Sequence, residues 1–171
     1  MRLKPEMDAL SDTLHQLQET VWATAIRESD LLFPVIETVH VIALIMVVGT
    51  IARLDLRLLG FHAGARDIDG TARRLLPWTW SSFVLALVSG TLMFSSAAVK
   101  YAANPFFQAK LVLLVLAGLN MLAFQLGSGR TMAAWSPKRP PPGKARLAGA
   151  VSLLLWISVV AAGRWIGYTM H

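Results

Sequence analysis

Four long apolar stretches constrain the fold of this chain more than any motif does. They cover roughly residues 32–51, 75–99, 106–126 and 147–168. A bilayer core of about 30 Å is crossed by about 20 helical residues at a rise of about 1.5 Å each, so each stretch is long enough to span a membrane. Charged residues make up only 15% of the chain, whereas they make up about 25% of a typical soluble domain. We therefore expect an all-α integral membrane protein, built as a four-helix bundle.

Cysteine usage and motifs exclude several classes of site. The chain has no cysteine, which excludes disulfides, thiolate metal sites and c-type haem attachment. Histidine is then the only strong nitrogen ligand, and it occurs at His15, His40, His62 and His171. No nucleophile–base pair, P-loop or nucleotide fingerprint appears, so we predict no catalytic residue.

The basic residues predict the topology. The net charge of +6 does not indicate nucleic acid, because these residues flank the apolar stretches. The first connection holds Arg53, Arg57, Arg66, Arg73 and Arg74, and the third holds Arg130, Lys138, Arg139, Lys144 and Arg146, whereas the second holds only Lys100. The positive-inside rule places both basic connections in the cytoplasm. This predicts a multi-pass protein of the bacterial inner membrane with both termini periplasmic. The proline-rich segment 136–144 is expected to be an extended loop, and no cleavable signal is recognised.

The chain divides into an N-terminal segment, residues 1–30, and a transmembrane bundle, residues 31–171. Apolar side chains recur in the first segment at steps of three and four residues, at Met7, Leu10, Leu14, Leu17 and Val21. This pattern predicts an amphipathic helix of about five turns on the periplasmic side. Its apolar stripe has three candidate partners: the membrane surface, the mouth of its own bundle, or a helix of another protein.

Ionisable side chains inside the apolar stretches are the candidate binding residues. Glu37 and His40 lie on the first stretch, Lys110 on the third and Arg164 on the fourth. Counting 1.5 Å per residue from each helix end, in the topology above, brings all four to the outer third of the bilayer. A charge there costs roughly 2.5–3.5 kcal/mol, so we expect these side chains to face one another in a polar pocket. The structural alternative is that Glu37 neutralises Arg164 or Lys110, or that Lys110 reaches to the surface.

The charges of this group indicate the chemistry of a ligand. Two cations and one carboxylate leave a positive surplus, which favours a haem propionate or a quinone oxygen. The candidate cofactors are thus haem b and a quinone, with His40 as the metal ligand of the haem or as the group that hydrogen-bonds the quinone. A second axial ligand for haem would come from Met93, His15, His171 or the His40 of a second subunit.

A second polar level is expected near the cytoplasmic side. Asn120 and Gln125 lie on the third stretch at this depth. We interpret Arg53 and Arg57, with Asp55 between them, as an interfacial anchor for lipid headgroups. Gly163 and Gly167 have the small-xxx-small spacing that lets another helix approach closely.

Several short motifs resemble a known family. They are Glu37-Thr38-Val39-His40, Asp55-Leu56-Arg57-Leu58-Leu59-Gly60, Leu76-Pro77-Trp78-Thr79-Trp80, Asn104-Pro105-Phe106-Phe107-Gln108-Ala109-Lys110, Leu119-Asn120 and Gly163-Arg164-Trp165-Ile166. Together they resemble an uncharacterised family of small four-helix bacterial inner-membrane proteins. The layout is similar to the membrane modules of b-type cytochromes and of copper-resistance proteins. In the family pattern the third helix often ends in Phe-His, where this chain has Phe124-Gln125. This departure removes a candidate haem ligand near the cytoplasmic side, and it therefore weakens the interpretation that the bundle binds two haems.

Three classes of function fit these observations. The first is a haem- or quinone-binding membrane subunit in electron transfer, with Glu37, His40, Lys110 and Arg164 as its binding residues. The second is an ion or small-solute handling protein, in which Glu37 and His40 bind a proton or a metal ion. The third is a structural or assembly partner of a larger membrane complex, or a homo-oligomer, whose polar cluster only fixes the register of the helices.

Overall fold

The computed structural model describes residues 3–61, 68–130, 135 and 141–170, with side chains from residue 9 onward. These residues form seven α-helices. Their bounds are α1 Leu3–Gln18, α2 Val21–Glu28, α3 Leu32–Leu59, α4 Ile68–Ser96, α5 Ala98–Ala103, α6 Pro105–Leu126 and α7 Gly143–Thr169. Within the described ranges there is no strand. The predicted all-α class is confirmed.

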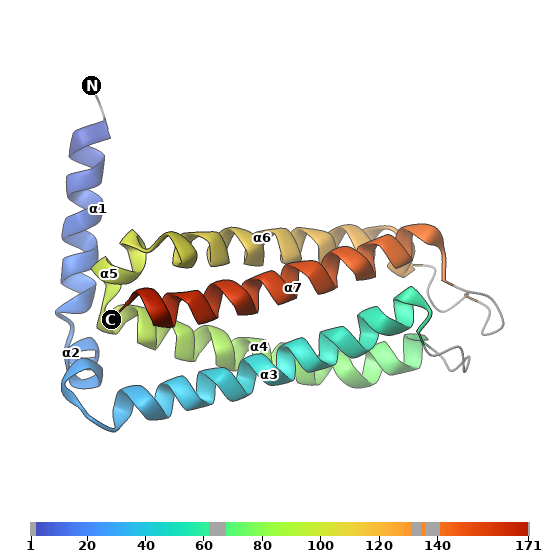
Figure 1. Ribbon diagram of the computed structural model, residues 1–171, viewed down its shortest axis with the longest axis horizontal. Helices are drawn as coiled ribbons and strands as arrows, with labels where there is room; N and C mark the ends of the chain where they lie inside the picture. Colours follow the sequence, from blue (N-terminus) through green and yellow to red (C-terminus); the bar gives the residue numbers. More distant parts are fainter. Residues whose placement is uncertain (1–2, 62–67, 131–134, 136–140, 171) are drawn as a thin grey trace.

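The four long helices, α3, α4, α6 and α7, form the bundle (Figure 1). Each of them is long and apolar enough to cross a membrane. Helices α3 and α4 pack along each other, as do α6 and α7, and the two pairs meet through α3 and α7. By contrast, α4 and α6 make no close backbone contact in the described part of the chain. The protein is therefore a multi-pass membrane bundle that is least tightly closed on the side between α4 and α6.

The two ends of the bundle differ. Helices α1, α2 and α5 and both chain termini lie at one end, which we call the terminal end (Figure 1). The C-terminal ends of α3 and α6 and the N-terminal ends of α4 and α7 lie at the other, which we call the loop end. The termini thus share one end, as the topology requires, while the cellular side of that end stays a prediction. The predicted loop residues 136–140, and with them Lys138 and Arg139, lie outside the described residues, as do Arg66, His62 and His171.

The middle of the bundle is a tight apolar layer. It is formed by Val47 of α3, Ala117 of α6, and Trp156 and Val159 of α7, with Phe83 of α4 packed against it. Towards the loop end, α3 and α7 approach each other closely at Gly149. A Cβ there would lie 3.1 Å from the backbone oxygen of Asp55. The close approach expected at Gly163 and Gly167 is absent at Gly167, since a Cβ there would meet nothing within 4 Å.

The N-terminal segment is helical, as predicted, but it is interrupted. The helix α1 ends at Gln18 and α2 begins at Val21, so the expected five-turn helix is two helices. Helix α1 runs across the terminal end of the bundle and packs against α5, while α2 packs against α3 and α4 (Figure 1). The Arg27 guanidinium donates to the backbone oxygens of Gln18 at 3.0 Å and Ser96 at 3.4 Å. These contacts tie the segment to its own bundle, one of the three arrangements expected.

Candidate functional site

His40 is fixed by a hydrogen bond between two helices. Its Nδ1 lies 3.0 Å from Oγ of Ser89, a buried residue of α4. The Ser89 hydroxyl has one hydrogen and directs it to the backbone oxygen of Leu85, 2.7 Å away. Ser89 is then an acceptor towards the imidazole, so Nδ1 carries the ring proton. In this tautomer Nε2 is the ring nitrogen that carries the lone pair, the form that binds a metal or accepts a proton.

Two glycines make room for the side chains at this level. A Cβ at Gly90 of α4 would lie 3.0 Å from Cε1 of His40. A Cβ at Gly163 of α7 would lie 3.7 Å from Nζ of Lys110. The imidazole and the ammonium therefore lie directly against the backbones of α4 and α7. A larger residue at Gly90 would displace the imidazole, whereas one at Gly163 would be in van der Waals contact with the ammonium.

Lys110 lies close enough to His40 for its charge to act on the imidazole. The Lys110 side chain is half-buried, and no hydrogen bond or ion pair joins it to any residue that the structure describes. An ammonium within a membrane span is costly without a counter-charge. We call the group His40, Ser89, Gly90, Lys110 and Gly163 the histidine–lysine site. It is assembled from all four long helices.

The structure brings His40 and Lys110 together but leaves Glu37 and Arg164 on the outside of the bundle. Both of the latter residues are exposed. The Arg164 guanidinium donates to the Tyr168 hydroxyl at 3.2 Å and lies 4.9 Å from the centre of its ring. It is thus directed along α7 towards the terminal end. Among the described residues, Glu37 and Arg164 form no ion pair.

An aromatic cluster adjoins the histidine–lysine site towards the terminal end. The rings of Phe94 of α4 and Phe107 of α6 are stacked with their centres 5.2 Å apart. Tyr101 of α5 lies 5.6 Å from Phe107. These rings bridge α4 and α6, whose backbones do not meet. The cluster therefore lies about one helical turn from Gly90 on α4 and from Lys110 on α6, on the side of the chain termini.

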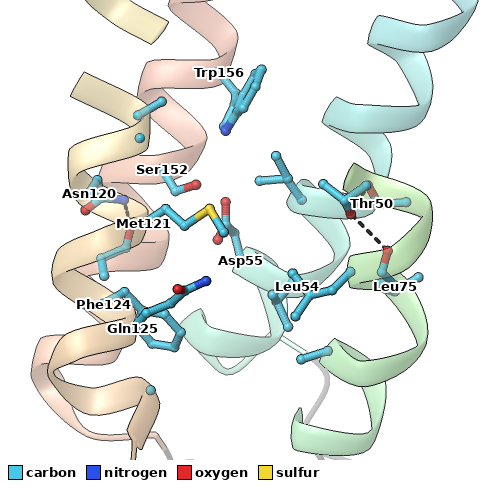
Figure 2. Close-up of a pocket in the computed structure, with 18 of the residues that line it drawn as sticks. Thr50, Leu54, Asp55, Leu75, Asn120, Met121, Phe124, Gln125, Ser152 and Trp156 are labelled. Carbon is cyan, nitrogen blue, oxygen red and sulfur yellow. Dashed lines mark hydrogen bonds between the residues drawn. The ribbon is translucent and has the colours of Figure 1, made fainter. Parts of the chain in front are cut away.

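A cavity of about 410 Å³ lies on the other side of the apolar layer, towards the loop end. Figure 2 shows its polar side chains, which include Asp55, Asn120 and Ser152. Asp55 is only 5% exposed, and its Oδ2 has no hydrogen-bond partner in the described part of the chain. The Ser152 hydroxyl lies near the same carboxyl.

The sequence-based interpretation of Asp55 as part of a headgroup anchor is therefore wrong. Its side chain points into the bundle, and Arg57 contacts Thr71 of α4. A signal was present in the sequence. His40, Ala43, Val47, Ile51 and Asp55 follow one another at steps of three or four residues, so they share one face of α3.

The described residues offer few groups that could complete a haem or metal site. No group of three His, Asp or Glu side chains with metal-binding geometry occurs among them. Of the other axial candidates, Met93 is half-buried. His15 lies on α1 and lines a surface pocket with Arg27 and Lys100 at the terminal end. His171 lies outside the described residues.

Comparison with known proteins assigns the chain to a family. Residues 30–169 match the model of a family of unknown function, DUF6644. No curated protein and no solved structure matches the chain. The resemblance to an uncharacterised family of small membrane proteins is thus confirmed. Since the match includes all four long helices and both polar levels, this protein belongs to the DUF6644 family.

Proposed function

We propose that this protein is a membrane subunit that binds a quinone at the histidine–lysine site. The observation that carries the proposal is the Lys110 ammonium, which has no partner among the described residues and lies within electrostatic range of the His40 imidazole, whose Nδ1 is held by Ser89. An unpaired cation inside a span favours a ligand that brings an oxygen acceptor.

The two groups complement the two redox forms of a quinone. The Lys110 ammonium donates to a carbonyl oxygen of the oxidised form. The His40 Nε2 accepts a hydrogen bond from a hydroxyl of the reduced form. The adjoining rings of Phe94 and Phe107 offer an apolar surface for the head group. Binding of both forms is what a subunit in electron transfer requires, with a partner protein as the source or acceptor of electrons.

Haem b is the second candidate. Its support is the same Nε2 lone pair, which would be the axial ligand, with Lys110 available for a propionate. The ion-handling and assembly functions predicted from the sequence need no organic ligand. Binding of a quinone or of haem therefore distinguishes them from the two functions proposed here.

Binding of ubiquinone-1 to the protein in nanodiscs tests the proposal. We expect retention above that of empty nanodiscs, and about tenfold weaker binding in His40→Ala and in Lys110→Met, since each removes one hydrogen bond to the ligand, one of them charge-assisted. Arg53→Gln, an exposed cation at the loop end, is the matched control. No retention by the wild type would reject the quinone. A reduced-minus-oxidised haem spectrum that is lost in His40→Ala would establish haem instead.

A further inference from the structure

The cavity at the loop end is separate from the histidine–lysine site. The apolar layer of Val47, Ala117, Trp156 and Val159 lies between the two. Along α3, Asp55 is 15 residues from His40, which corresponds to roughly 22 Å of helix. A single small ligand does not reach both polar levels.

Asp55 defines the chemistry of this cavity. It is the only carboxyl among the described lining residues, and its side chain points into the space (Figure 2). Its Oδ2 has no hydrogen-bond partner in the described part of the chain. The Ser152 hydroxyl hydrogen-bonds the carboxyl, but the buried Oδ2 still lacks a donor, which is unfavourable. A ligand that brings a donor to this carboxyl is therefore stabilised. The only cation in the lining is Arg130, which is exposed and lies beyond the end of α6.

The other polar groups near Asp55 also leave acceptors free. The Asn120 amide donates through Nδ2 to the backbone oxygen of Ala148 at 3.0 Å, which leaves its Oδ1 as an acceptor. The Ser152 oxygen lies beside the carboxyl. A ligand that fits these groups carries N–H donors, and a positive charge adds attraction to the carboxylate.

The rest of the lining is apolar and aromatic. The rings of Phe124 and Trp156 lie on opposite sides of the Asp55 level (Figure 2). Aromatic faces also attract cations, and the apolar side chains accommodate a hydrocarbon body. The volume of about 410 Å³ lies in the range of about 300–1,000 Å³ that is typical of small-molecule sites.

The position of the cavity indicates how a ligand reaches it. Trp80 of α4 and Gln125 of α6 both line the cavity and are exposed on the surface. They stand on the two helices that do not pack against each other. The rim therefore opens sideways between α4 and α6, towards the bilayer, which admits an amphiphile rather than a hydrophilic solute.

We propose that this cavity binds a lipophilic amine, with its ammonium group on Asp55 and its apolar body among the side chains of α4 and α6. Neither the family match nor the quinone proposal assigns such a site.

Three ligands with the same hydrocarbon chain test the proposal. Decylamine, decanol and decanoate are titrated calorimetrically into nanodiscs that carry the full chain, with empty nanodiscs as the blank. We expect saturable binding of decylamine only. Asp55→Asn removes the charge and keeps the shape of the side chain, so it should weaken decylamine binding by about 10- to 100-fold. Glu28→Gln, an exposed carboxyl of α2, is the matched control and should bind as the wild type does.

A second variant keeps the test decisive if Asp55→Asn fails to fold. Gly118 lines the cavity, and a Cβ there meets nothing within 4 Å, so Gly118→Leu has room to enter and fill the space. It should abolish decylamine binding while Asp55 is retained. The proposal is overturned if the wild type shows no saturable decylamine binding, if decanol or decanoate binds equally well, or if Asp55→Asn or Gly118→Leu binds decylamine unchanged.

Discussion

The imidazole of His40 lies against the backbone of Gly90, with its Cε1 only 3.0 Å from the point where a Cβ would be. A glycine in a helix interior costs roughly 0.5–1 kcal/mol relative to alanine. At this position the absence of a side chain leaves the space that the imidazole needs in order to reach Ser89.

Gly90→Ala should therefore disturb the His40–Ser89 hydrogen bond while the bundle stays folded, because the imidazole is the end of a side chain that is able to turn. The ¹⁵N resonances of the ring, measured with labelled histidine, should show loss of the single Nδ1–H form. Gly49→Ala is the matched control, since its Cβ meets nothing within 4 Å. It should stabilise the protein by about 0.5–1 kcal/mol through helix propensity. An unchanged imidazole spectrum in Gly90→Ala would contradict the close contact.

Asn104 joins the start of α6 to the end of α7. Its Oδ1 accepts from the backbone N–H groups of Phe106 and Phe107, and its Nδ2 donates to the Thr169 hydroxyl at 2.7 Å. Asn104→Ala should lower the free energy of unfolding by about 1–2 kcal/mol in a thermal or denaturant titration. Asn104→Asp keeps the cap and loses only the donor to Thr169, so it should cost less. Equal losses in the two variants would show that the cap contributes little.

The long helices could be predicted from the sequence because span length and hydropathy determine them. The side of each helix that faces the bundle could not be predicted, since a membrane helix is apolar towards lipid as well as towards its neighbours. On α3 the inward residues include His40, Ala43, Val47 and Asp55, whereas Glu37, one turn before His40 near the start of the helix, is exposed. Depth placed His40 and Lys110 at a common level, but the exposure of Glu37 and the burial of Asp55 depend on how the neighbouring helices cover α3.

The short helices were missed for a related reason. Helix α5 follows a break at Ala97, where φ is −148° and ψ is 46°. Neither glycine nor proline marks this position, and the apolar run continues through it to Val99. The break between α1 and α2 also lacks such a marker. Both breaks lie where α1, α2 and α5 pack together at the terminal end, and such long-range contacts are not visible in the local sequence.

The two ends of the bundle should lie on opposite sides of the membrane, with the terminal end outside. Single cysteines can replace Ala103, the last residue of α5, and Pro142, just before α7, which are both exposed in the structure. In intact cells an impermeant maleimide should label the first and not the second, and permeabilised cells should allow both. The absence of native cysteine makes the background low. Labelling of both positions from outside would refute the topology.

Tyr101 should make stability sensitive to high pH. Burial, and to a lesser degree the charge of Glu37, raises the pKa of its phenol above 10.0. The folded state then favours the neutral form, so its contribution is complete below about pH 10 and is lost as pH rises through the folded pKa. The unfolding midpoint of the wild type should fall more than that of Tyr101→Phe between pH 9 and about pH 11. Parallel curves would contradict the assignment.

Replacement of Lys110 should stabilise the bundle and remove its ligand binding together. The ammonium is half-buried in a membrane span and has no described partner, so Lys110→Met deletes a costly charge and keeps the length of the side chain against Gly163. We expect a gain of about 1–3 kcal/mol in the free energy of unfolding in detergent, with loss of ubiquinone-1 retention. Lys100→Met, at an exposed position of α5, should change neither. If Lys110→Met instead destabilised the protein and kept the quinone, the ammonium would have a structural role and the proposed function would fail.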